Sequence, residues 1–93
     1  MREIEWTTRF KRDYRREKKA QLGDKLDATL AQILTALSCD SALDERYRDH
    51  PLAGEWKDHR DCHVRPDLVL IYRKPDPETL VLVRLSSHSE LGW

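Results

Sequence analysis

Cysteine is scarce in this chain of 93 residues, where it occurs only as Cys39 and Cys62. The two positions form no C-x-x-C pair and no export signal accompanies them, so we expect two reduced thiols rather than a disulfide framework. Long hydrophobic runs are missing as well, and none approaches the roughly 20 apolar residues that span a bilayer. The first six residues also lack the apolar stretch of a signal peptide. We therefore expect a cytosolic protein with no membrane span.

Net charge is absent too, because 17 Lys and Arg residues balance 17 Asp and Glu residues. A neutral chain is not expected to be a strong non-specific binder of nucleic acid. The charge is nevertheless uneven, since residues 1–25 carry nine basic and five acidic groups, a net +4 that leaves −4 for the remainder. This basic segment either contacts phosphates or forms a solvated helix face, and the charge run alone leaves both interpretations open.

A chain of this length, 39% hydrophobic and 37% charged, predicts one domain spanning residues 1–93. Residues 2–6 alternate polar and apolar side chains, as a short half-buried strand does. Thr7 or Thr8 can then cap a helix, whose remaining faces are basic and which Gly23 ends.

A second helix is predicted from Asp24 onward, where the aspartate can act as its cap. Its apolar side chains recur at the spacing of one buried helix face. They are Leu26, Leu30, Ile33, Leu34 and Leu37. The periodicity then stops in a polar connection over residues 38–54, which carries His50 on a loop or strand edge.

Three strands are predicted after this connection, over residues 55–64, 68–73 and 79–85. The middle one is continuously apolar, so we expect it to be buried on both faces. Short turns at 65–67 and 75–78 make the three strands an antiparallel meander. With the first strand at an edge and both helices packed on the sheet, the predicted fold is α+β in the order β-α-α-β-β-β.

Titratable side chains cluster just before and within this meander. On the strand that ends at Val64, the period of two puts His59, Asp61 and His63 on one face. Asp67 follows across the tight turn and His88 follows the last strand, so both can approach that face if the sheet twists normally. Histidine titrates near neutrality, and the cluster therefore predicts an acid/base site.

Several segments together resemble the RelE/ParE superfamily of bacterial toxin endoribonucleases, most closely its YafQ-like branch. They are 47–52 (YRDHPL), 54–57 (GEWK), 60–67 (RDCHVRPD), 70–72 (LIY) and 84–91 (RLSSHSEL). The resemblance implies a meander with packed helices, cleavage of messenger RNA in the ribosomal A site without a metal or other cofactor, and neutralisation by an antitoxin. It also implies that operator DNA is bound only through the antitoxin complex.

The family's functional positions fall on five residues of this chain, with Arg84 as a basic neighbour. They are His50, Asp61, His63, Asp67 and His88. RNA cleavage of this kind needs a base for the ribose hydroxyl, an acid for the leaving oxygen and positive charge over the phosphate. We expect His50 or His63 as the base and the other, or His88, as the acid, with the two aspartates orienting imidazoles or sharing a proton.

Positive charge over the phosphate would come from a protonated histidine, Arg84 or Arg65, and the expected product is a 2′,3′-cyclic phosphate. The basic first helix then becomes a contact to ribosomal RNA through Arg15, Lys18 and Lys19. The family usually has an aromatic residue four positions after the last histidine, where this chain has Gly92. Trp93, one place later, can stack on a base instead.

Two other functions fit parts of the pattern. His59, Asp61 and His63 on one strand face, with His50 or His88, could supply the ligands of a zinc site. The domain could also act without catalysis, by binding RNA or a protein such as a topoisomerase, as other members of the superfamily do. The histidines favour the catalytic interpretation.

Overall fold

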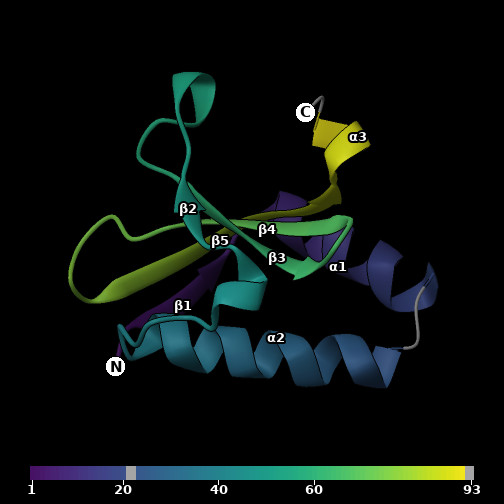
Figure 1. Ribbon diagram of the computed structural model, residues 1–93, viewed down its shortest axis with the longest axis horizontal. Coiled ribbons are helices and arrows are strands. Elements are labelled where there is room, and N and C mark those ends of the chain that lie inside the picture. Colours follow the sequence, from purple (N-terminus) through teal and green to yellow (C-terminus); the bar gives the residue numbers. More distant parts are fainter. Residues whose placement is uncertain (21–22, 92–93) are drawn as a thin grey trace.

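The computed structural model of the protein describes residues 1–20 and 23–91 (Figure 1). Strand β1 (Glu3–Trp6) leads into the helices α1 (Thr8–Ala20) and α2 (Gly23–Ser38). The rest consists of the strands β2 (His50–Pro51), β3 (Arg60–Arg65), β4 (Leu68–Arg73) and β5 (Thr79–Ser87), two short 3-10 turns at Glu45–Tyr47 and Gly54–Trp56, and the final helix α3 (His88–Leu91). None of the helices in the described part of the chain is long and apolar enough to cross a membrane.

The five strands form one sheet in the order β1-β5-β4-β3-β2. β1 pairs in parallel with β5 at one edge, and the other neighbours are antiparallel. The predicted α+β class, the meander and the edge position of the first strand are confirmed. The two-residue strand β2, which places His50 beside β3, was not predicted.

Helices α1 and α2 cover one face of the sheet and close the hydrophobic core (Figure 1). The predicted apolar stripe of α2 supplies much of that core, since Leu26, Leu30, Ile33 and Leu37 are buried while Leu34 is partly buried against it. Leu70, Leu82 and Leu85 meet this stripe from the sheet.

Strand β4 is buried along all its length except Arg73, which confirms the prediction of a strand covered on both sides. Every second residue of β4 belongs to the core under the helices. Val69 and Ile71 project to the opposite face and are nevertheless fully buried. The side chains of neighbouring strands must cover them there, and these include the predicted site residues.

The start of α1 is fixed by Thr7 rather than Thr8. The Thr7 hydroxyl accepts a hydrogen bond from the backbone N–H of Phe10 at 3.0 Å and donates one to the carbonyl oxygen of Val83 at 2.8 Å. The helix is therefore capped and tied to β5 by one side chain. The predicted cap by Asp24 lies outside the side chains that the structure describes.

The predicted strand over residues 55–64 is wrong in its first half. Residues 54–56 form a 3-10 turn, with Gly54 at φ 67° and Asp58 at φ 70°, and the strand begins only at Arg60. Positive φ angles interrupt an extended backbone, and polar-apolar alternation does not reveal them. The prediction that His59 shares a strand face with Asp61 and His63 fails with it, because its ring packs edge-on against Trp56 at 5.4 Å between centroids.

Candidate active site

Two rows of paired residues cross the face of the sheet that α1 and α2 leave uncovered. In the first row, β2, β3, β4 and β5 contribute His50, Asp61, Ile71 and Arg84. The second row consists of His63, Val69 and Ser86. Residues directly opposite each other in antiparallel strands project to the same side. The sheet register therefore brings four predicted site residues together, and His88 follows where β5 ends.

Asp61 is the buried centre of this group, with 1% of its surface exposed. Its Oδ1 atom lies 2.9 Å from Nδ1 of His50, within ion-pair distance when the imidazole is protonated. The ring N–H points instead at the carbonyl oxygen of Arg48, also at 2.9 Å. Within the described part of the chain, Oδ1 of Asp61 therefore has no hydrogen-bond donor, and its contact with His50 is one of charge.

Burial raises the pKa of Asp61 above its usual value. The charges of His50, His63 and His88 act in the opposite direction and lower that pKa, so all three imidazoles are close enough to interact with one carboxyl group. A carboxylate that is costly to ionise and surrounded by titratable rings is typical of sites built for proton transfer.

The backbone of Arg48 decides which nitrogen of His50 carries the proton. Arg48 has a left-handed backbone (φ 50°, ψ 48°) at the end of the 3-10 turn Glu45–Tyr47. A carbonyl oxygen can only accept a hydrogen bond, so Nδ1 of His50 must bear the hydrogen, which leaves Nε2 of the neutral ring as an acceptor. With 51% of the His50 side chain exposed, a substrate can reach this ring.

His63 and His88 form a second pair of rings. Their centroids are 5.0 Å apart with the planes inclined at 48°. His63 comes from β3, while His88 begins α3 directly after β5. Two elements that are distant in the sequence, β3 and α3, therefore hold two imidazole rings beside each other.

The short strand β2 is fixed by Asp49, a residue of the YRDHPL segment to which the sequence alone assigned no role. Its carboxylate accepts hydrogen bonds from the hydroxyl of Tyr72 and, at 3.3 and 3.4 Å, from the guanidinium of Arg60. Tyr72 is 1% exposed and belongs to the core, where burial raises the pKa of its hydroxyl. Asp49 thus connects the residue next to His50 to the centre of the sheet.

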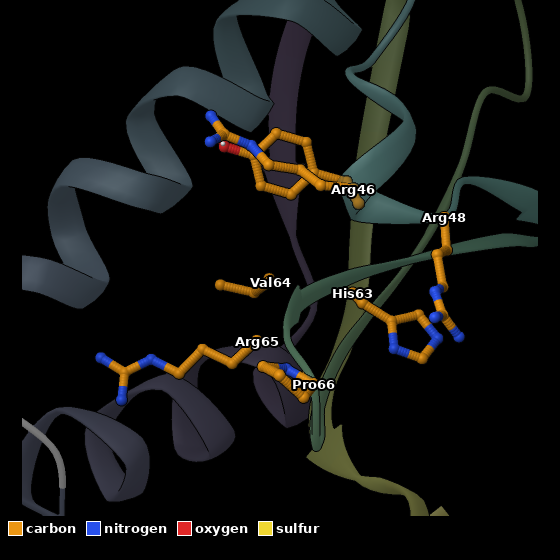
Figure 2. A pocket seen from close by; sticks show the side chains of 7 residues that line it. Arg46, Arg48, His63, Val64, Arg65 and Pro66 are labelled. Carbon is orange, nitrogen blue, oxygen red and sulfur yellow. Dashed lines mark hydrogen bonds between the residues drawn. The ribbon is translucent and has the colours of Figure 1, made fainter.

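A cavity of about 370 Å³ opens at the edge of β3 beyond the end of β2. It is lined by Arg46, Tyr47, Arg48, His63, Val64, Arg65 and Pro66. Figure 2 shows the side chains of Arg48 and His63 directed to one side of this cavity, while Arg46 and Arg65 extend to the other. Sequence reasoning proposed Arg65 here but missed Arg46 and Arg48, although both lie only a few residues before His50.

Arg84 lies in the first row but binds a protein carboxylate. Its Nε donates to Asp13 of α1 at 2.7 Å, and its Nη2 donates to the hydroxyl of Ser86 at 2.8 Å. Asp13 is only 3% exposed and also accepts a hydrogen bond from the backbone N–H of Leu85 at 3.0 Å. Leu85 belongs to the part of β5 that continues past its pairing with β1. Arg84 therefore brings positive charge to the open face while its guanidinium is held by Asp13.

The other predicted residues lie farther from the cluster. Asp67 is exposed in the turn between β3 and β4 and forms no hydrogen bond or ion pair with the described residues. Lys18 pairs with Asp27 at 3.2 Å, and Arg15 lines a groove between α1 and α2. Lys19 is exposed in the last turn of α1, and Trp93 lies outside the described residues.

The zinc interpretation finds no support in the arrangement of the side chains. Across residues 1–20 and 23–91, no three His, Cys, Asp or Glu side chains are placed so that they could hold one ion together. The charges of His50, His63 and His88 instead act on Asp61, and the ring of His59 packs against Trp56.

The fold and the cluster define a small α+β protein with three histidines gathered around a buried aspartate on the open face of its sheet. Over residues 2–92 the chain matches the family described as bacterial toxin of type II toxin-antitoxin system, YafQ. It is 37% identical to the mRNA interferase toxin YafQ of Escherichia coli K12 over 91 residues. The alignment covers 97% of this chain and 95% of that protein. The chain therefore belongs to the YafQ family of type II toxins, which confirms the resemblance seen in its motifs.

Other similar proteins support the same family assignment. The putative toxin YafQ of Haemophilus influenzae is 42% identical over 66 residues, which are 64% of this chain and 65% of that protein. Among solved structures, a metal-bound toxin from Helicobacter pylori superposes with a TM-score of 0.86 at 42% identity, covering 98% of this chain and 99% of that one. The toxin of the E. coli DinJ-YafQ complex superposes with a TM-score of 0.83 at 35% identity, covering 98% of both chains.

Proposed function

We propose that this protein is a ribosome-dependent mRNA interferase, an endoribonuclease that cleaves message in the ribosomal A site by metal-independent acid/base catalysis. The ribose 2′-hydroxyl attacks the adjacent phosphorus and the 5′-oxygen leaves, which gives a 2′,3′-cyclic phosphate. The observation that carries the proposal is the convergence of three histidines on the buried carboxyl of Asp61. Membership of the YafQ family, whose E. coli member is an mRNA interferase, supports the same conclusion.

His50 is the general base in this proposal. Its Nδ1 hydrogen is held by the carbonyl oxygen of Arg48, so Nε2 has the lone pair that can accept the proton of the 2′-hydroxyl. Asp61 lies 2.9 Å from Nδ1 and stabilises the imidazolium that forms after this transfer. The ring is exposed enough for a bound strand to reach it.

The pair of His63 and His88 supplies the general acid. One protonated ring of the pair donates its proton to the leaving 5′-oxygen, and the neighbouring ring 5.0 Å away can return a proton from solvent. We assign the acid role to the pair, because both rings face Asp61 and share one environment.

Positive charge for the phosphorane comes from the arginine-lined cavity beside His63. Arg48 lies on the same side of it as that histidine, Arg65 lines its other side (Figure 2), and a guanidinium group can bind two phosphate oxygens at once. Arg84 contributes charge from the far end of the first row, through a guanidinium that Asp13 orients. Asp67 remains a candidate for sharing a proton with the histidines. In this role its side chain would have to move to the cluster when the substrate binds.

The proposed partners are the ribosome with its message and a cognate antitoxin, in line with the DinJ-YafQ complex of the E. coli relative. Operator DNA would be bound only through the antitoxin complex, and the site of action is the cytoplasm, where translation occurs. Arg15, Lys18 and Lys19 remain candidates for ribosomal RNA contacts, and Trp93 for base stacking.

The test is a reconstituted translation reaction in which the 5′ ends of the message are mapped after adding the wild type, His63→Ala or His59→Ala. We expect cuts only in translated message, cyclic phosphate ends, no cuts with His63→Ala and normal cuts with His59→Ala, whose ring packs on Trp56 outside the cluster. Cleavage of naked RNA at the same rate would make the protein a free ribonuclease. Growth inhibition that survives both His63→Ala and Asp67→Ala would favour a binding toxin instead.

A further inference from the structure

A second positively charged cavity lies on the other side of the histidine cluster, between α1 and the end of β5. Its volume is about 470 Å³. It is lined only by charged side chains, namely Arg9, Arg12, Asp13, Arg16, Arg84 and Glu90. Four guanidinium groups face two carboxylates, so the lining has a net charge of +2. The proposed reaction uses Arg84, held by Asp13, but assigns no role to the other four lining residues.

Two of the four guanidinium groups have no partner among the residues that the structure describes. Arg84 is bound to Asp13, and Arg16 is shared among Asp13, Glu17 and Glu90, the last at 2.9 Å. Arg9 and Arg12, in contrast, form no hydrogen bond or ion pair with the residues that the structure describes. Both lie on the exposed side of α1, so their charge is available to an anion from outside.

The cavity borders the face of the sheet that carries the histidines. Arg84 binds the hydroxyl of Ser86, which is opposite Val69 and therefore in the row that contains His63. Glu90 belongs to α3, whose first residue is His88 (Figure 1). A strand that places one phosphate at the histidines can therefore place another phosphate group of the complex at this cavity.

The lining favours RNA over a protein partner. A docked helix or strand of a protein needs apolar contacts, and none of the six lining residues is hydrophobic. The groove on the opposite side of α1 differs in this respect, because Trp6, Phe10, Tyr14 and Leu34 line it. Guanidinium groups in a polar cavity suit the oxygens of a phosphodiester.

We propose that the cavity formed by Arg9, Arg12, Arg16 and Arg84 binds a backbone phosphate of RNA and anchors the toxin beside its cleavage site. This inference rests on the proposed function and extends it to a defined surface. The phosphate comes from the message or from ribosomal RNA, and the chemistry of recognition is the same for both.

Two double variants with the same change of charge provide the test, Arg9→Glu/Arg12→Glu in the cavity and Lys57→Glu/Arg73→Glu at two exposed positions that do not line it and have no role in the proposed function. Binding is measured to vacant ribosomes and to a 2′-O-methyl oligouridylate of about ten nucleotides, which the toxin cannot cleave. Thermal unfolding of each variant verifies that it is folded. We expect the cavity variant to bind about tenfold more weakly than its matched control, with a salt slope shallower by roughly 0.7 for each phosphate that it no longer neutralises.

Weaker binding to both ligands would assign the cavity to the message strand, and weaker binding to ribosomes alone would assign it to ribosomal RNA. Equal affinities of the two double variants would overturn the inference while leaving the proposed function intact. A wild type that binds no ribosomes would overturn both. A last arm of the test uses polyglutamate. If the wild type binds polyglutamate more tightly than the oligonucleotide, and Arg9→Glu/Arg12→Glu does not bind polyglutamate, the cavity belongs to an acidic protein and the inference is overturned.

Discussion

The two faces of the sheet differ in what they bury. Under α1 and α2, the side chains of Leu70, Leu82 and Leu85 meet the leucines of α2 in an apolar core. On the open face, the same strands bury Asp61 without a hydrogen-bond donor for one oxygen among the described residues and leave three histidines around it. One face stabilises the fold, whereas the other carries groups that cost stability and are suited to chemistry.

Removal of the proposed base should produce the largest effect and confine it to the open face. His50→Gln keeps a polar side chain but cannot accept the proton, so we expect message cleavage to fall by about 10²- to 10⁴-fold. Stability should stay within about 0.5 kcal/mol of the wild type because the side chain is half exposed. Single-turnover cleavage and urea unfolding measure the two quantities, and an unaltered cleavage rate would remove His50 from the proposed mechanism.

Truncation on the helix-covered face should have the opposite signature. Ile33 is fully buried in the core, and Ile33→Ala should lower the free energy of unfolding by about 2–5 kcal/mol. The rate of cleavage per folded molecule should stay unchanged at a temperature where the variant is folded. A control truncation, Thr35→Ala on the exposed side of α2, should change little. Cleavage that falls in proportion to stability would mean that the two faces are not separable.

Asp49 links the two faces, and its removal should affect both moderately. Asp49→Ala leaves the buried hydroxyl of Tyr72 without an acceptor, which costs about 1–3 kcal/mol, and releases the backbone that positions His50. Tyr72→Phe is the control, because Asp49 keeps Arg60 and no buried donor is left unpaired. We expect a lower kcat in Asp49→Ala and a nearly normal kcat in Tyr72→Phe. Equal kinetics in the two variants would show that the contact is only structural.

Local patterns predicted the apolar face of this protein better than its open face. The stripe of α2 and the buried strand β4 follow from hydrophobic periodicity, which packing enforces. The left-handed backbone of Arg48 and the turn at residues 54–56 depend on positive φ angles that side-chain alternation does not encode. The burial of Asp13 was likewise invisible, because a carboxylate in a basic helix resembles a surface charge until Arg84 is brought to it.

A change at Asp61 should alter the free energy of unfolding with an unusual sign. Burial raises the pKa of this carboxyl in the folded state, so the folded protein binds its proton more tightly than the unfolded chain does. The stability of the wild type should therefore fall as the pH rises from about 4, the ordinary value for an aspartate, to the raised pKa, and stay constant above it. Asp61→Asn removes this decline, and a difference of one in pKa corresponds to about 1.4 kcal/mol.

The histidines make this prediction sharper, because His50, His63 and His88 lower the pKa of Asp61 when they are charged. If burial dominates, Asp61→Asn is at least as stable as the wild type at pH 7 while its cleavage of message falls, since the imidazolium of His50 loses its counter-charge. If the ion pair at 2.9 Å dominates instead, the variant is less stable than the wild type at pH 5–6. Urea unfolding of both proteins from pH 4 to pH 8 separates the two cases, and a stability difference that shrinks as the pH rises would contradict the view that the open face holds its carboxylate at a cost.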